Sequence, residues 1–454
     1  MASATVVAVA LPALAGDIGA DGAEQQWIVD AFVLVFASLL VAGGVVADRR
    51  GRRTALLAGL CLFAAGSLWC VLAPSVDWLI AGRVVQALGP PLVLPASLAI
   101  VTSTYADPAA RARAVGLWGA GSGLGLTLGP LLGGLLVDGL GWRWVLGVNI
   151  PICAALALLA FRFIPLDRPP RPAHRFDGPA AVMLTAGVAL TVFGLIEGRR
   201  LGWSSGAVLG AFALASALGV MFGRRELVHP APLVDLRLLR RRAFLAANLG
   251  GATLFGALTG LAVYFSVYFQ QIQGRSALEA GLCLLPQGAL TMLCAPLAGR
   301  LTARHGPRPP VLAGMALAAI AILALLRLEP GTPIAEVGWA FALLGVGTGL
   351  ALPAMTVTAL ASAPAEQAGM ASAVHNASRQ LGQTFGVAIL GTIILAHAGD
   401  AAEKGALTGA LAVKWVDGLH LALLASAGAL LVAALAAGFL IPRGVQGARS
   451  ADGA

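Results

Sequence analysis

Residues 54–73 read TALLAGLCLFAAGSLWCVLA, a stretch of twenty residues without a charged side chain. A helix of that length rises about 30 Å, which is the thickness of the hydrocarbon core of a bilayer. The stretch therefore predicts a transmembrane helix. It directly follows GVVADRRGRR at residues 44–53, whose four arginines are typical of a loop on the cytoplasmic side of a membrane.

The composition of the whole chain agrees with this stretch. Of the 454 residues, 58% are hydrophobic and 11% are charged, and the mean hydropathy is +0.86. Soluble domains carry about 25% charged residues. Since so few charges cannot cover a surface exposed to water, we expect an all-α protein that crosses a membrane many times. The 58 glycines suit helices that approach one another closely in lipid.

Similar apolar stretches recur along the chain and, with a short first segment at 2–16, predict fourteen spans. The other thirteen are expected at 26–47, 54–73, 78–101, 111–137, 143–164, 178–198, 205–223, 243–269, 278–301, 310–327, 336–360, 369–396 and 417–441. The first segment rises only about 21 Å. We therefore expect the first helix to be truncated, with about ten residues missing before Met1.

The basic residues predict the orientation of these spans. With both termini in the cytoplasm, 21 of the 30 basic residues fall in inner loops and the C-terminal tail, and 7 in outer loops. Arg83 and Arg379 lie within spans. This asymmetry follows the positive-inside rule, so the net charge of +9 is explained by lipid headgroups and requires no nucleic acid.

The chain also repeats itself, because GRLTARHGPR at residues 299–308 resembles the segment at 44–53. The repeat predicts two halves of equal topology. We expect an N-terminal six-helix bundle at 1–165, linkers and a two-helix insert at 166–242, a C-terminal six-helix bundle at 243–441 and a cytoplasmic tail at 442–454.

Ten short motifs, taken in order, resemble those of one family of membrane proteins. They are TVVAVALP at 5–12, QWIVDAF at 26–32, GVVADRRGRR at 44–53, RVVQ at 83–86, GLTLGPLLGG at 125–134, WRW at 142–144, NIP at 149–151, QQ at 270–271, LP at 285–286 and NASRQLG at 376–382. This ordered set resembles the major facilitator superfamily, and within it the fourteen-span drug:proton antiporters of the EmrB/QacA type.

The resemblance implies a fold and a function. The fold is the major facilitator fold, with two pseudo-symmetric six-helix bundles and two extra central helices. The function is export of amphipathic small molecules, such as drugs, antibiotics or secondary metabolites, by alternating access. The expected partners are the substrate, protons and lipid. The proton gradient supplies the energy, no cofactor is needed, and the protein works as a monomer in the plasma (inner) membrane of a bacterium.

Two motifs have expected roles in gating. The resemblance implies that Gly44, Asp48, Arg49, Gly51 and Arg52 form a cytoplasmic latch that stabilises the outward-open state; simple anchoring by positive charge is the alternative. It also implies that a glycine-rich helix forms a hinge and a seal between the halves; generic packing of small residues is the alternative. The residues of this antiporter helix motif are Gly125, Gly129, Pro130, Gly133 and Gly134.

Two charged residues are expected to couple protons to transport. Asp30 lies about one turn inside its span, and we expect it to carry the proton, unless it is an interfacial carboxylate. An arginine inside a span is usually functional, and the resemblance implies coupling for Arg83, with extension of its side chain to the outer headgroups as the alternative. The chain departs from the family pattern at Ser3 and Ala8, where an acid and an asparagine are usual, which questions the efflux of polycations.

Polar and aromatic side chains within the spans are candidates for a substrate cavity, although each could instead connect helices. They are Trp118, Asn248, Tyr264, Tyr268, Gln270, Gln271, His375, Asn376, Arg379, Gln380 and Gln383. No metal-ligand spacing and no phosphate-binding loop occurs in the sequence, so we expect neither a metal site nor an enzyme. Two alternatives to proton-driven export stay open: an uncoupled facilitator or importer of a small solute, and a non-transporting membrane sensor or assembly partner.

Overall fold

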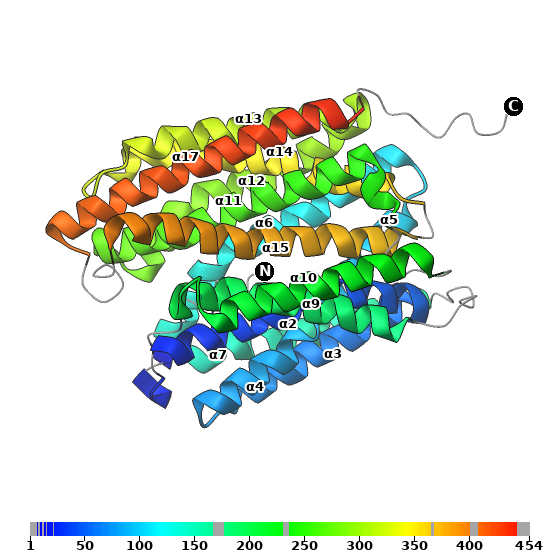
Figure 1. The fold of residues 1–454 in the computed structure, drawn as a ribbon, viewed down its shortest axis with the longest axis horizontal. Coiled ribbons are helices and arrows are strands. Elements are labelled where there is room, and N and C mark those ends of the chain that lie inside the picture. Colours follow the sequence, from blue (N-terminus) through cyan, green and yellow to red (C-terminus); the bar gives the residue numbers. More distant parts are fainter. Residues whose placement is uncertain are drawn as a thin grey trace, which may run out of the picture.

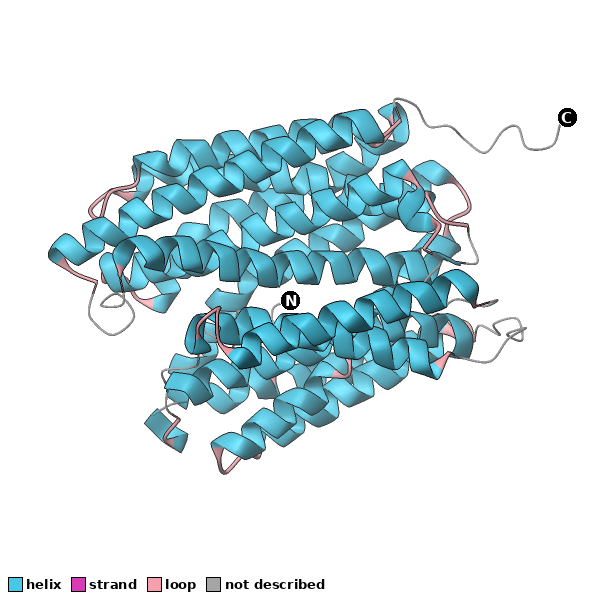
Figure 2. Ribbon diagram, in the orientation of Figure 1, coloured by secondary structure: helices cyan, strands magenta, loops and turns pink. Residues whose placement is uncertain are grey.

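The computed structural model describes residues 7, 10, 13–14, 16–20, 22–166, 177–229, 236–364, 367–399 and 407–442. Every element in these ranges is a helix, and the helices run side by side with loops gathered at the two ends of the bundle (Figure 2). In order, the elements are α2 (Gly22–Arg50), α3 (Arg52–Val71), α4 (Val76–Ala87), α5 (Pro90–Thr104), α6 (Pro108–Leu140), α7 (Trp142–Gly147), α8 (Asn149–Phe163), α9 (Gly178–Leu201), α10 (Gly206–Val228), η1 (Leu238–Arg240), α11 (Arg242–Val267), η2 (Tyr268–Ile272), α12 (Ala277–His305), α13 (Arg308–Ala324), η3 (Leu325–Arg327), α14 (Ile334–Ala361), α15 (Ala368–Ala398) and α17 (Gly409–Leu440).

The lengths of these helices suit a bilayer. Among the described residues, 11 helices or joined helix pairs are long and apolar enough to cross a membrane. In addition, α2 and α6, which are 29 and 33 residues long, run through the same bundle (Figure 1). The structure therefore confirms the expected all-α polytopic fold. The predicted first span at 2–16 lies mostly outside the described residues.

Some predicted spans are interrupted where the backbone lacks donors or changes pitch. The span expected at 78–101 consists of α4 and α5, which meet at Leu88 and Gly89. The break occurs there because Pro90 and Pro91 begin α5 and have no N–H to continue the hydrogen bonding of α4. Similarly, the span expected at 143–164 is divided between α7 and α8, and the span expected at 243–269 ends in the π-helical turn η2.

The helices form two groups that lie one above the other in Figure 1. The upper group contains α11 to α17, and aromatic side chains fill its centre: the rings of Phe265 and Phe341 meet edge to face at 4.9 Å, and Phe269 packs on Phe341 at 6.1 Å. The lower group contains α2, α3, α4 and α7, and α5 and α8 pack on its helix α3. The core of the lower group includes Leu79 and Trp142.

Several pairs of helices connect the upper group with helices that precede it in the chain. Along one side α6 packs against α12, and along another α2 packs against α15. A Cβ added to Gly116 of α6 would lie 2.9 Å from the carbonyl oxygen of Ala295 of α12. The absence of a side chain at Gly116 therefore permits this close approach between the groups.

The groups are also packed together at the end of the bundle that bears the turns 49–53, 240–242 and 300–308, here called the Arg-rich end. One apolar cluster there contains Val45 of α2, Phe222 of α10, Phe244 of α11 and Met370 of α15. Burial of apolar surface from both groups holds this end closed.

The two helices α9 and α10 form an antiparallel pair that is part of the same contact. They pack on each other, and α9 also contacts α2 and α15 (Figure 1). The pair thus lies along the seam between the two groups. Asp177, directly before α9, accepts a hydrogen bond from the backbone N–H of Ala180 at 3.0 Å and so caps the helix.

Candidate functional site

Arg83 is completely buried and connects α4 with α2. Its Nε donates to the carbonyl oxygen of Ile28 at 3.0 Å, and its guanidinium also donates to Oε1 of Gln86 at 2.6 Å. The guanidinium carbon lies 4.4 Å from the centre of the Phe32 ring. Because Ile28 and Phe32 flank Asp30, the structure places Arg83 against the turn of α2 that bears this carboxylate. The side chain of Asp30 lies outside the described part.

Gln86 extends this connection to α3. Its Nε2 donates to the hydroxyl oxygen of Ser67 at 2.7 Å, and that hydroxyl donates to the carbonyl oxygen of Phe63 at 2.8 Å. Gly66 beside it lets the backbone of α4 come close to α3, because a Cβ there would overlap the backbone of Gln86. Arg83 is therefore fixed by groups on three helices and does not extend toward the headgroups.

The turn between α2 and α3 contains the expected latch. Gly51 has a φ of +98°, a left-handed conformation that glycine adopts at little cost. Arg52 donates to the carbonyl oxygen of Ala99 at 3.3 Å, and Arg53 donates to that of Phe161 at 2.8 Å. These arginines hold α3 to α5 and α8. Of the other latch residues, Gly44 is buried within α2, Arg49 is half-buried, and the side chain of Asp48 is outside the description.

The second copy of this turn has the same backbone shape. Gly306, which aligns with Gly51, has a φ of +81° and separates α12 from α13 as Gly51 separates α2 from α3. The internal repeat in the sequence is thus matched by the backbone conformation of both turns.

The predicted antiporter helix motif lies on α6. Gly129, Gly133 and Gly134 are buried, and a Cβ added to Gly134 would meet Leu278 of α12 at 4.0 Å. α6 is continuous from Pro108 to Leu140. The side chains at positions 125 and 130 are not among those described, so the expected hinge at Pro130 stays a prediction.

Two polar residues of the predicted cavity set, Asn248 and His375, meet a third polar residue, Thr356, between α11, α14 and α15. Nδ1 of His375 lies 3.3 Å from Oδ1 of Asn248, and its Nε2 lies 3.2 Å from the hydroxyl oxygen of Thr356. Nδ2 of Asn248 also donates to the carbonyl oxygen of Phe244 at 2.8 Å. Thr356 was not in the predicted set, since a threonine in an apolar helix carries no distinguishing signal in the sequence.

Arg379 lies one helical turn beyond His375 on α15. It is 4% exposed, and its guanidinium carbon is 3.9 Å from the centre of the Phe255 ring on α11. The space for both side chains comes from Gly251, where an added Cβ would lie 3.2 Å from the His375 ring and 3.5 Å from Cγ of Arg379.

The other predicted cavity residues do not gather around this cluster. Tyr264 and Tyr268 are buried in the core of the upper group, and their hydroxyls donate to the carbonyl oxygens of Val387 and Glu329. Gln271 is exposed at the helix end.

The remaining members of the predicted set form hydrogen bonds with neighbouring residues or have no contact with the Asn248 cluster that the structure records. Trp118 donates to the hydroxyl of Ser97 at 3.3 Å, Gln270 to that of Ser266 at 2.7 Å, and Asn376 to the carbonyl oxygen of Ser372 at 2.9 Å; Gln380 is buried and Gln383 is half-buried.

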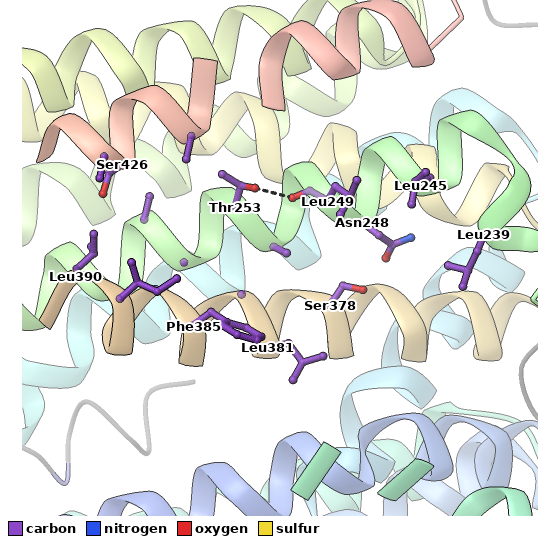
Figure 3. A pocket seen from close by; sticks show the side chains of 18 residues that line it. Leu239, Leu245, Asn248, Leu249, Thr253, Ser378, Leu381, Phe385, Leu390 and Ser426 are labelled. Atoms are coloured by element: carbon purple, nitrogen blue, oxygen red, sulfur yellow. Dashed lines mark hydrogen bonds between the residues drawn. The ribbon is translucent and has the colours of Figure 1, made fainter. Parts of the chain in front are cut away.

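A groove of about 510 Å³ lies beside the Asn248 cluster, between α11, α15 and α17 (Figure 3). Apolar residues form most of its wall, including Leu249, Leu381 and Phe385. The hydroxyls of Thr253 and Ser378 line it as well, but each donates to a carbonyl oxygen of its own helix at 2.9 Å. The groove is therefore largely apolar. No pattern in the sequence predicts this groove.

The groove exists because α11 and α15 cross through glycines. A Cβ added to Gly382 would overlap the backbone of Ala252, and one added to Gly386 would overlap that of Gly256. Two small residues spaced four positions apart, here Gly382 and Gly386, are the sequence pattern that is typical of closely crossing helices.

An ion pair at the Arg-rich end joins the two helices of the α9–α10 pair. Nε of Arg225 lies 2.8 Å from Oδ2 of Asp177, and Nε2 of His229 lies 3.5 Å from the same oxygen. The hydrogen bond from Arg225 lowers the pKa of Asp177 below its usual value. This ion pair was not recognised in the sequence, because its residues lie 48 positions apart.

The sequence matches a known family over most of its length. Residues 1–387 fit the family described as the Major Facilitator Superfamily. The chain belongs to this superfamily. As members of this superfamily are membrane transporters, the protein is a multi-pass transporter rather than an enzyme.

Its relatives carry names that describe resistance and efflux. This transporter is 36% identical to the multidrug resistance protein Stp of Mycobacterium tuberculosis over 399 residues, covering 87% of this chain and 73% of that protein. It is 34% identical to the methylenomycin A resistance protein of Streptomyces coelicolor, covering 90% and 85%. It is 32% identical to the multidrug efflux pump LfrA of Mycolicibacterium smegmatis, covering 86% and 77%.

Solved structures confirm the major facilitator fold. The human organic anion transporter MFSD10 superimposes with a TM-score of 0.65 at 17% identity, covering 96% of both chains. The proton:xylose symporter XylE superimposes with a TM-score of 0.62 at 14% identity, covering 97% of this chain and 92% of that one. At these identities the likeness concerns the fold alone.

Within this fold the transporter has two distinct buried polar clusters. In the first, Arg83 donates hydrogen bonds to the carbonyl oxygen of Ile28 on α2 and to Gln86 on α4. The second, around Asn248, His375 and Arg379, lies in the upper group beside an apolar groove. In the described ranges, no group of three or more His, Cys, Asp or Glu side chains is placed so that it could hold a metal ion.

Proposed function

We propose that this transporter exports amphipathic small molecules from the bacterial cytoplasm in exchange for protons, by alternating access. The observation that carries the proposal is the burial of Arg83 against the turn of α2 that bears Asp30. A cation held beside a carboxylate favours its charged form. Movement of α2 relative to α4 would change that contact and so couple protonation of Asp30 to the conformation of the bundle.

The relatives support export rather than import. Their printed names describe multidrug resistance, resistance to methylenomycin A and multidrug efflux. Removal of a toxic compound from the cell is the simplest way for a transporter to confer resistance. We therefore assign the chain to the fourteen-span drug:proton antiporters, with a six-helix bundle at 1–165, an insert at 166–242 and a second bundle at 243–441.

The arrangement of charge supports a specific orientation. We place the Arg-rich end in the cytoplasm together with both termini, in accord with the positive-inside rule. The apolar cluster at that end then closes the cytoplasmic side, as expected of a transporter that faces outward. The groove between α11, α15 and α17 supports lipophilic cargo, because its wall is mostly apolar.

The proposal is tested in everted membrane vesicles from a host that lacks its own efflux pumps. Lipophilic antibiotics should accumulate inside energised vesicles that contain the transporter, and an uncoupler should abolish the accumulation. Equal accumulation with and without the uncoupler would favour the uncoupled facilitator. Ligand binding without any flux would favour the membrane sensor.

A further inference from the structure

Arg379 is a buried cation whose hydrogen bonds are not made. Its guanidinium has five N–H donors, yet no acceptor in the described part of the chain reaches it, and its Nε is inaccessible and without a partner. The contact that the structure records for the group is the face of the Phe255 ring. Buried charges in membrane proteins are usually paired and mark functional positions.

Arg83 is a second buried arginine of this chain, and its acceptors lie within the fold. It is as deeply buried as Arg379 and also lies over an aromatic ring, but it donates to the carbonyl oxygen of Ile28 and to Gln86. Arg379 lacks such acceptors. The difference indicates that the partner of Arg379 is supplied from outside the fold.

Among the described side chains, the surroundings of Arg379 contain other polar groups but no compensating acid. Its polar neighbours on α15 are His375, which contacts Asn248 and Thr356, and Gln380. Gln380 is 4% exposed, and its Oε1 also has no hydrogen-bond partner.

The buried carboxylates are elsewhere. Among the described residues, Asp177, Glu197 and Glu226 are the buried acids, and all three lie on or directly before α9 and α10. Asp177 is paired with Arg225. No described carboxylate therefore balances the charge of Arg379, and its guanidinium favours an anion and disfavours a cation.

We propose that Arg379 binds the acidic group of the transported molecule, so that the cargo is an amphipathic anion, such as a carboxylate, rather than a lipophilic cation. This inference rests on the proposed function. Arginine binds carboxylates through two parallel N–H···O bonds, and Oε1 of Gln380 supplies an acceptor one residue away for a donor on the same ligand. The apolar groove on the same pair of helices, α11 and α15, suits the hydrocarbon part of such a molecule.

The test is a binding assay on the purified full-length transporter, which does not depend on proton coupling. The probe is tritiated 1-naphthylacetate, and the competitors are unlabelled 1-naphthylacetate, its neutral amide and 1-naphthylmethylammonium, which share the same ring. We expect the acid to compete at least tenfold better than the amide and the cation to compete least. A cation that competes as well as the acid, or no binding of the acid, would overturn the proposal.

Substitutions test whether the preference for the acid depends on Arg379. Arg379→Gln should weaken binding of the acid about tenfold or more, since hydrogen bonds to a charged group are strong, and should leave the affinity of the amide nearly unchanged. Arg379→Lys should retain most of the preference for the acid. The matched control is Arg327→Gln at an exposed arginine, which should behave as wild type. An equal loss for acid and amide in Arg379→Gln would indicate a structural role and contradict the inference.

The outcomes separate this inference from the proposed function. If the vesicles show uncoupler-sensitive efflux but binding does not depend on the charge at position 379, the assignment of an anionic cargo fails alone. If binding depends on Arg379 while the vesicles show no flux, the export function fails. Should Arg379→Gln not fold, the preference of the wild-type protein for the acid over the amide decides the question.

Discussion

Replacement of Gly382 by alanine tests the packing on which the groove and the Arg379 cluster depend. The three atoms closest to an added Cβ are the oxygen, carbon and Cα of Ala252, all of them backbone. No side chain can rotate away from such a contact, so α15 and α11 must separate. Overpacking of this kind costs about 1–3 kcal/mol. The change from glycine to alanine also favours the helix itself, by up to about 1 kcal/mol.

A control variant corrects for the higher helix preference of alanine over glycine. Gly210 on α10 is exposed, and an added Cβ there meets nothing within 4 Å. Gly210→Ala should therefore gain the helix preference without the overlap, so the free energy of unfolding of Gly382→Ala should lie about 1–3 kcal/mol below that of Gly210→Ala. Both are measured by reversible denaturation in mixed micelles of dodecyl sulfate and a mild detergent. Equal stability of the two variants would refute the close crossing of α11 and α15.

Two further predictions concern charged residues. Arg83→Gln should reduce transport about tenfold or more, because Ile28 and Gln86 lose a charged donor, whereas Arg83→Lys should retain part of the activity; unchanged efflux in Arg83→Gln would exclude a coupling role. The pKa of Asp177 is lower in the folded protein than in the unfolded chain, so its carboxylate stabilises the fold at neutral pH. This stabilisation is lost as the pH falls below about 4 and through the pKa that Asp177 has in the folded protein. Melting curves of Asp177→Asn should lack that acid dependence; parallel curves for variant and wild type would contradict it.

Hydropathy and charge were enough to predict an all-α protein with many membrane-spanning helices. The stretch 54–73 lies within α3 and the following turn, and Gly51 and Gly306 adopt the same unusual φ, as the repeat in the sequence indicates. The break between α4 and α5 was also foreseeable, since Pro90 and Pro91 cannot donate to the preceding turn.

The composition of the site was harder to predict, because it depends on how each helix is rotated. Asn248 and His375 are 127 positions apart and meet only after α11 and α15 have crossed. Tyr264 and Tyr268 look like cavity residues in the sequence but point into the core of the upper group. The groove arises from backbone contacts at Gly382 and Gly386, which local patterns do not locate in space.

The most direct test of proton-coupled export is the exchange of protons for substrate in proteoliposomes, compared between wild type and Asp30→Asn. Addition of a transported drug should release protons from wild-type vesicles that hold an imposed gradient, and Asp30→Asn should bind the drug but release none. Glu336→Gln, at an exposed carboxylate on α14, serves as the control and should behave as wild type. Proton release by Asp30→Asn equal to that of wild type would contradict the coupling mechanism.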